Sequence, residues 1–123
     1  IAVLDWELST LGHPLADLGY NCMMYHFGEG FGASEGYAGM DLKAFGIPTE
    51  QEYLAAYARR TNRKEIPDWN FFVAFSLFRL AAIVQGVYKR GLDGNASSET
   101  AKQYGNRARV LADLGWSRVK NGA

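Results

Sequence analysis

The 123-residue sequence contains a single cysteine, Cys22, and it shows no excess of charge of either sign. One cysteine excludes an internal disulfide, so the fold must depend on packing and suits a reducing, cytoplasmic compartment. We find no basic segment followed by an apolar stretch and a small-residue cleavage site, so we predict no secretory signal. Composition thus excludes disulfide-stabilised, collagen-like and disordered classes, and 48% hydrophobic residues indicate an ordinary globular domain.

The thirteen Lys and Arg residues balance the thirteen Asp and Glu residues. Nucleic-acid binding normally requires a larger positive charge and a recognisable reading motif, and the sequence has neither. The balance conceals a division: residues 1–58 hold one base and eight acids, whereas residues 59–123 hold twelve bases and five acids. We therefore expect an acidic segment that suits a cation and a basic segment that suits an anionic ligand, and ordinary solvation of both surfaces is the alternative.

An uninterrupted apolar run of membrane-spanning length is also missing. Only Ser76 and Arg79 are polar between Phe71 and Val84, and Arg79 lies within the run. The run is shorter than the ~20 residues that cross a bilayer, so we predict no membrane partner. We expect the helix that carries this run to be buried nearly all round, as the core of one domain.

Helical patterns account for most of the chain. Pro14 suits a first helical turn, and Thr49 with Glu52 forms a capping box. The predicted helices cover residues 14–26, 49–62, 68–90 and 97–119. The glycine-rich stretch over residues 27–39 predicts a loop and has no phosphate-binding fingerprint. The fold class is mainly α, with one short β-strand at the start.

That strand is predicted over residues 1–7, an apolar run that ends at two acids. A strand needs neighbours for its backbone groups and no partner strand is evident, so we expect the chain to be the carboxyl-terminal part of a longer protein. Asp5 and Glu7 face the same side of an extended segment. Paired carboxylates there suit Mg²⁺, which prefers hard oxygen ligands, and a solvated turn or helix cap is the alternative.

Two pairs of segments resemble known kinase sequences. Segments 1–7 (IAVLDWE) and 12–18 (GHPLADL) resemble the metal-binding segment and following helix of the aminoglycoside phosphotransferase-like kinases. Segments 75–83 (FSLFRLAAI) and 85–90 (QGVYKR) are similar to a narrower branch, the kinase-like domains related to those beside acyl-CoA dehydrogenase domains. The resemblance covers nearly the whole chain and implies the helical carboxyl-terminal lobe of a protein-kinase-like fold.

Site roles follow from the resemblance residue by residue. It implies that Asp5 holds Mg²⁺ against the phosphates of ATP and that Glu7 reaches a second metal or its water shell. Asp17 matches a helical residue that supports the catalytic loop. That loop, which holds the catalytic base, and the amino-terminal lobe are expected upstream of Ile1. No catalytic residue is therefore expected within the 123 residues, which should be inactive alone.

The implied function of the complete polypeptide is transfer of the γ-phosphoryl group of ATP to a small-molecule hydroxyl. A hydroxyacyl-CoA or related hydroxy acid is the leading acceptor, by resemblance to the branch. The expected partners are ATP, this acceptor and the rest of the kinase polypeptide, and a homo-oligomer is compatible with the sequence. The alternative is an autonomous helical binding or interaction module without catalysis.

Arg79 and His13 are the remaining candidates for substrate contact. A guanidinium within an apolar run needs an acceptor, which is either a structural acid such as Asp17 or an anionic substrate. His13 precedes Pro14 near the metal segment, where it either caps the helix or lines the cleft.

Cys22 and His26 lie four residues apart on one helix, the spacing of two zinc ligands. No further Cys or His pair completes a zinc site, so we interpret both residues as packing residues.

Overall fold

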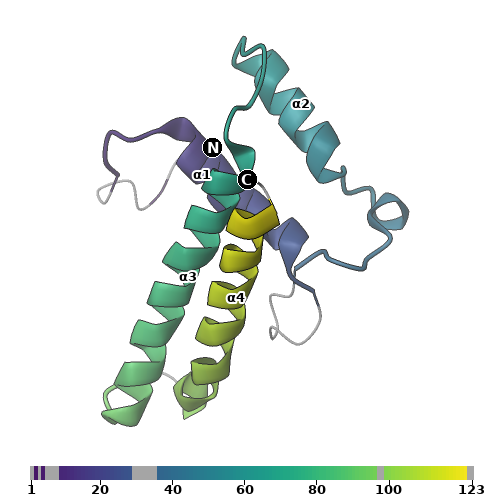
Figure 1. Ribbon diagram of the computed structural model, residues 1–123. Helices are drawn as coiled ribbons and strands as arrows, with labels where there is room; N and C mark the ends of the chain where they lie inside the picture. Colours follow the sequence, from purple (N-terminus) through teal and green to yellow (C-terminus); the bar gives the residue numbers. More distant parts are fainter. Residues whose placement is uncertain (1, 3, 5–8, 29–35, 97–98, 122–123) are drawn as a thin grey trace.

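A computed structural model describes residues 2, 4, 9–28, 36–96 and 99–121. Two long helices, α3 (Trp69–Leu92) and α4 (Gly105–Asn121), lie side by side and run in opposite directions (Figure 1). The short helix α1 (Pro14–Cys22) crosses one end of this pair, and α2 (Glu50–Arg60) lies to one side (Figure 1). The mainly α prediction is confirmed, and the strand predicted over residues 1–7 lies largely outside the described part.

The start of α1 follows the signals in the sequence. Pro14 occupies the first helical position, where its missing N–H would have had no helical partner. His13 precedes it in an extended conformation, and its Nδ1 accepts a hydrogen bond from the backbone N–H of Leu15 at 3.3 Å. The helix continues as the 3₁₀ turn η2 (Met23–His26), so α1 and η2 together occupy residues 14–26.

The capping box at the start of α2 is complete. The backbone N–H of Glu52 donates to Thr49 Oγ1 at 3.2 Å, and the N–H of Thr49 donates to Glu52 Oε2 at 2.8 Å. Two backbone donors that the helix itself leaves unpaired are thereby satisfied. The 3₁₀ turn η3 (Leu42–Phe45) precedes this helix and ends at Gly46, whose left-handed backbone favours glycine.

The last helical segment has two parts. The 3₁₀ turn η4 (Glu99–Tyr104) precedes α4, where one continuous helix was predicted over residues 97–119. At the junction Gly105 lies against Tyr88 of α3, and a Cβ there would fall 2.9 Å from that ring. Ser97 and Ser98, at the start of that predicted helix, lie outside the described residues.

The core forms where α1 and η2 meet the α3–α4 pair. One cluster combines the inner stripes of α3 and α4 with the end of α1 and η2. Its buried members are Met23, Phe27, Val73, Leu77, Ala81, Val84, Ala108 and Leu111. A second cluster of Leu15, Leu18 and Cys22 packs against side chains of α2 and α3. Close packing of this kind supplies most of the stabilisation of a small domain.

The prediction that α3 is buried nearly all round is wrong. Phe71, Phe75 and Phe78 are 62%, 43% and 66% exposed, and Ile83 is 47% exposed. Within the described chain α3 packs against α1 and η2 on one stripe and against η4 and α4 on another, which leaves a third stripe open. By length and composition alone, α3 would also be able to cross a membrane, a test that core helices of globular proteins pass as well.

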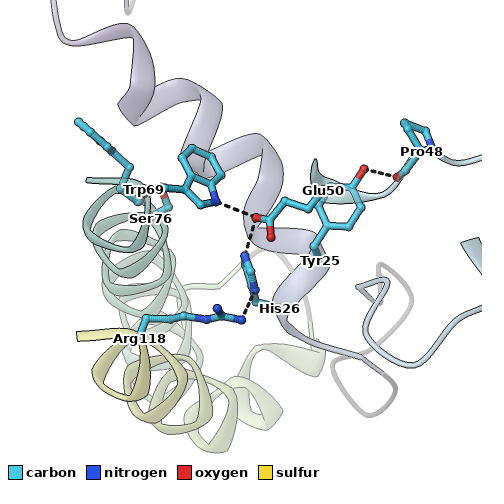
Figure 2. Close-up of polar contacts among 8 residues, drawn as sticks. Tyr25, His26, Pro48, Glu50, Trp69, Ser76 and Arg118 are labelled. Atoms are coloured by element: carbon cyan, nitrogen blue, oxygen red, sulfur yellow. Dashed lines mark hydrogen bonds and ion pairs between the residues drawn. The ribbon is translucent and has the colours of Figure 1, made fainter. Parts of the chain in front are cut away.

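The region of α2 is attached differently. None of the residues of α2 is fully buried. Tyr53, Leu54 and Tyr57 pack partly against the second cluster, and the hydroxyl of Tyr53 accepts a hydrogen bond from the side-chain amide of Asn21. Just before the helix, the hydroxyl of Tyr25 donates to the backbone carbonyl of Pro48 at 2.8 Å (Figure 2). Polar side-chain contacts therefore provide much of the interaction that holds α2 to the rest of the molecule.

Candidate functional site

The candidate metal ligands precede α1. Asp5 and Glu7 lie outside the described residues, so the magnesium prediction rests on the chemistry of two carboxylates two positions apart. Among the residues that are described, no group of three Cys, His, Asp or Glu side chains forms a metal site.

His13 directly precedes α1. Its ring stacks on Phe72 of α3, with centroids 5.0 Å apart and planes 14° apart. Because Nδ1 accepts from the N–H of Leu15, the proton of the neutral ring lies on Nε2. His13 is therefore a helix cap with a fixed ring. The predicted contact with substrate stays a prediction.

Asp17 lies in the first turn of α1, and its side chain is exposed. A carboxylate in this position interacts favourably with the partial positive charge of the helix N-terminus. The predicted support of a catalytic loop by Asp17 stays a prediction. The exposure of Asp17 leaves its oxygens accessible to such a loop.

Arg79 is exposed, so the expectation of a buried guanidinium is wrong. Its guanidinium carbon lies 5.0 Å from the centroid of the Tyr20 ring, over the face of that ring. Within the described residues no ion pair joins it to Asp17, which had been the structural alternative. A cation–π contact of this kind orients the guanidinium while its N–H groups stay available to an anion.

Sequence reasoning missed a polar network that joins four helical elements (Figure 2). Its centre is His26 at the end of η2, whose side chain is 5% exposed. His26 Nε2 lies 2.8 Å from Glu50 Oε1 at the start of α2, and Trp69 Nε1 of α3 donates to the same oxygen at 3.0 Å. On the other side of the ring, Arg118 of α4 contacts Nδ1.

The donors and acceptors of this network are mutually consistent. A guanidinium has only N–H donors, so Nδ1 of His26 accepts from Arg118 and Nε2 donates its proton to Glu50. Burial raises the pKa of Glu50, but the hydrogen bond and charge of His26, the Trp69 N–H and the charge of Arg118 together hold it below its usual range. Both ring nitrogens are occupied, so we interpret the network as a structural clamp.

Cys22 is chemically inert in this structure. Its side chain is fully buried in the second cluster, and burial together with the nearby charge of Glu50 raises the pKa of its thiol to about 12. The thiolate that binds zinc is therefore strongly disfavoured, and His26 already uses both nitrogens. The interpretation of Cys22 as a packing residue agrees with the structure, whereas His26 belongs to the polar network.

Comparison with known proteins aligns nearly all of the chain with much longer relatives. It is 49% identical over 116 residues to acyl-CoA dehydrogenase family member 10 of Mus musculus, with 94% of the chain aligned. The chain is homologous to acyl-CoA dehydrogenase family members 10 and 11. It is 43% identical to family member 11 of Homo sapiens over 94% of its length, and 39% identical to the probable acyl-CoA dehydrogenase IBR3 of Arabidopsis thaliana over 98%.

The aligned part is a small share of those relatives. The chain spans 11% of family member 10 and 15% of each of the other two. No family model and no solved structure matches it.

Proposed function

We propose that the chain is the carboxyl-terminal part of an ATP-dependent phosphotransferase domain that modifies a small-molecule hydroxyl. The observation that carries the proposal is the order of three acids: Asp5 and Glu7 precede α1, and Asp17 is exposed in its first turn. This order is similar to that of the aminoglycoside phosphotransferase-like kinases. The relatives named acyl-CoA dehydrogenase family members support the narrower branch, because the kinase-like sequences of that branch lie beside acyl-CoA dehydrogenase domains.

The residues of this chain would contribute to the reaction mainly by binding the metal ion. Asp5 and Glu7 would hold Mg²⁺, and their carboxylate oxygens fit the hard ligands that this ion prefers. The bound ion would offset the charge of the ATP phosphates. Asp17 would support the catalytic loop, and the base would come from that upstream loop. Cytoplasmic location and the absence of nucleic-acid and membrane partners belong to the same proposal, which is also compatible with a homo-oligomer.

Arg79 and His13 are proposed to contact the acceptor. The exposed guanidinium of Arg79 suits a phosphate or carboxylate, and it lies in the segment of positive charge excess. A hydroxyacyl-CoA carries such anionic groups, which favours it over a cationic amino alcohol or aminoglycoside as the acceptor. If Arg79 contacts the acceptor, Arg79→Met in the complete polypeptide raises KM for it while the thermal midpoint stays near the parent value. An unchanged KM for the acceptor would show that Arg79 does not contact it.

The test uses the complete polypeptide with Mg²⁺ and ATP. ATP consumption is measured against hydroxyacyl-CoAs, amino alcohols and aminoglycosides. We expect turnover with a hydroxyacyl-CoA and a loss of roughly 10³-fold or more in Asp5→Asn. Asp113→Asn, an exposed acid on α4, is the matched control and should keep the parent rate.

Binding gives a second readout that does not depend on the acceptor. ATP with Mg²⁺ should raise the thermal midpoint of the parent and of Asp113→Asn, and the rise should be lost in Asp5→Asn. Equal ATP consumption by the parent and Asp5→Asn would refute the assignment of Asp5. Absence of ATP binding by the parent would favour the helical interaction module.

A further inference from the structure

The open stripe of α3 and the adjacent side of α4 together form an apolar groove. Its lining is apolar throughout and includes two exposed large side chains of α4, Trp116 at 58% and Val119 at 48%. The α3–α4 groove is lined by Phe71, Ala74, Phe75, Phe78, Ala112, Gly115, Trp116 and Val119. Five of these are large side chains that are about half exposed, which leaves roughly 500 Å² of apolar surface open to solvent. Patches of that size on a monomer commonly mark a contact surface.

The shape of the groove fits one helix. Gly115 of α4 packs closely against α3, and a Cβ at this position would lie 3.3 Å from the carbonyl oxygen of Ala74. Small residues therefore make the floor, and the aromatic side chains of α3 and Trp116 make the walls. The hollow has a volume of about 300 Å³, and a second one of about 350 Å³ shares Phe78 and continues along the same helices to Gly105. The stretch from Gly105 to Val119 is roughly 20 Å long, the length of a helix of three to four turns.

The charge around the groove argues against a second copy of this chain as the occupant. The two helices α3 and α4 carry seven Lys and Arg residues and one acid, Asp113. Two such surfaces placed face to face would repel each other, and a symmetric interface needs a self-complementary patch. The fitting partner instead presents an apolar ridge with acidic side chains along its edges.

We propose that the α3–α4 groove receives an amphipathic helix from another part of the complete polypeptide, apolar on one face and acidic along both edges of that face. The chain is about one-seventh or less of the relatives it matches, so their polypeptides have ample length to supply such a helix. The inference rests on the groove and the homology, and it holds whether or not the domain transfers phosphate.

Oxidative footprinting of the complete polypeptide, read by mass spectrometry of tryptic peptides, tests the proposal. Phe78 and Phe45 form a matched pair, because they are 66% and 68% exposed in this chain. They fall in different peptides, since Arg79 ends one and Lys43 precedes the other. In a monomeric fraction we expect Phe78 and Trp116 to be labelled at least about fivefold less than Phe45, because a docked helix excludes water from its contact.

Two substitutions of exposed alanines sharpen the test. Ala112→Glu places a carboxylate in the groove, whereas Ala55→Glu places one on the open side of α2. A carboxylate at position 112 is compatible with the basic surface of this chain alone but not with an apolar ridge seated on it. We therefore expect Ala112→Glu to raise the labelling of Phe78 and Trp116 toward that of Phe45, and Ala55→Glu to leave it unchanged.

Three outcomes would overturn the proposal. One is labelling of Phe78 and Trp116 in the monomer as heavy as that of Phe45. Another is protection that appears only in dimeric fractions, which would assign the groove to a second copy. The third is protection that requires vesicles of phosphatidylcholine and phosphatidylserine, which would assign it to a lipid surface.

Discussion

The α3–α4 pair and the α2 region are held to the molecule by different forces. The pair buries Val73, Leu77 and Leu111 completely, so its stability comes from apolar packing. No residue of α2 is fully buried, and Glu50 ties its first turn to His26 and Trp69. Apolar packing is lost all at once when a core unfolds, whereas an attachment through polar contacts opens locally. The same chain should therefore contain a cooperative unit and a detachable one.

The largest effect is expected in the cooperative unit. Leu77→Ala removes a completely buried side chain from the centre of the main cluster and should lower the free energy of unfolding by about 2–5 kcal/mol. Urea denaturation followed by circular dichroism measures it. Ile83→Ala, half exposed on the same helix, is the control and should cost less than about 1 kcal/mol. Similar costs for the two variants would contradict the assignment of the core stripe.

A smaller loss is expected where α1 crosses α3. A Cβ on Gly19 would lie 2.7 Å from the carbonyl oxygen of Phe72, so Gly19→Ala forces the two helices apart and should cost about 1–3 kcal/mol. Gly86→Ala has space for the same methyl group, since its nearest neighbour is the flexible end of Arg90 at 3.7 Å. That variant should gain up to about 1 kcal/mol from helix propensity. Thermal denaturation of the two variants gives shifts of opposite sign if the crossing is as described.

A local effect is expected in the α2 region. Glu50→Ala leaves the N–H groups of His26 and Trp69 without their acceptor, which should cost about 1–3 kcal/mol. We expect hydrogen exchange in α2 to rise at least about tenfold while the interior of α3 keeps its protection. Gln51→Ala, exposed on the next position, is the control. Equal acceleration in α2 and α3 would show that the two regions unfold together.

The smallest effect is a pH dependence of the same attachment. The pKa of Glu50 is lower in the folded protein than its ordinary value of 4.5, so the carboxylate stabilises the fold above that value. This stabilisation is lost as the pH falls through the lowered pKa. We expect the difference in α2 exchange between the parent and Glu50→Ala, compared at equal pH, to shrink below pH 4.5. A difference that does not shrink at any pH down to the acid unfolding of the parent would exclude Glu50 as the titrating group.

The sequence predicted correctly those features of the fold that depend on local interactions. Pro14 and the Thr49–Glu52 box depend on neighbours within a few residues, and both appear in the structure. The network around His26 was missed because its members come from distant parts of the chain, up to 92 residues apart. A helix that is apolar all round does not reveal which stripe stays open, so the exposure of Phe78 required the structure. Asp5 and Glu7 lie outside the described residues and remain sequence predictions.

Alkylation of the buried thiol of Cys22 offers a way to measure the detachment of α2. It lies in the cluster on which Tyr53, Leu54 and Tyr57 of α2 pack. Alkylating reagents attack only the thiolate of an accessible cysteine, and this one is both enclosed and protonated in the closed form. Each modification therefore records one opening event. When modification is faster than reclosing, the alkylation rate at Cys22 equals the opening rate of α2, a helix that carries no reactive group itself.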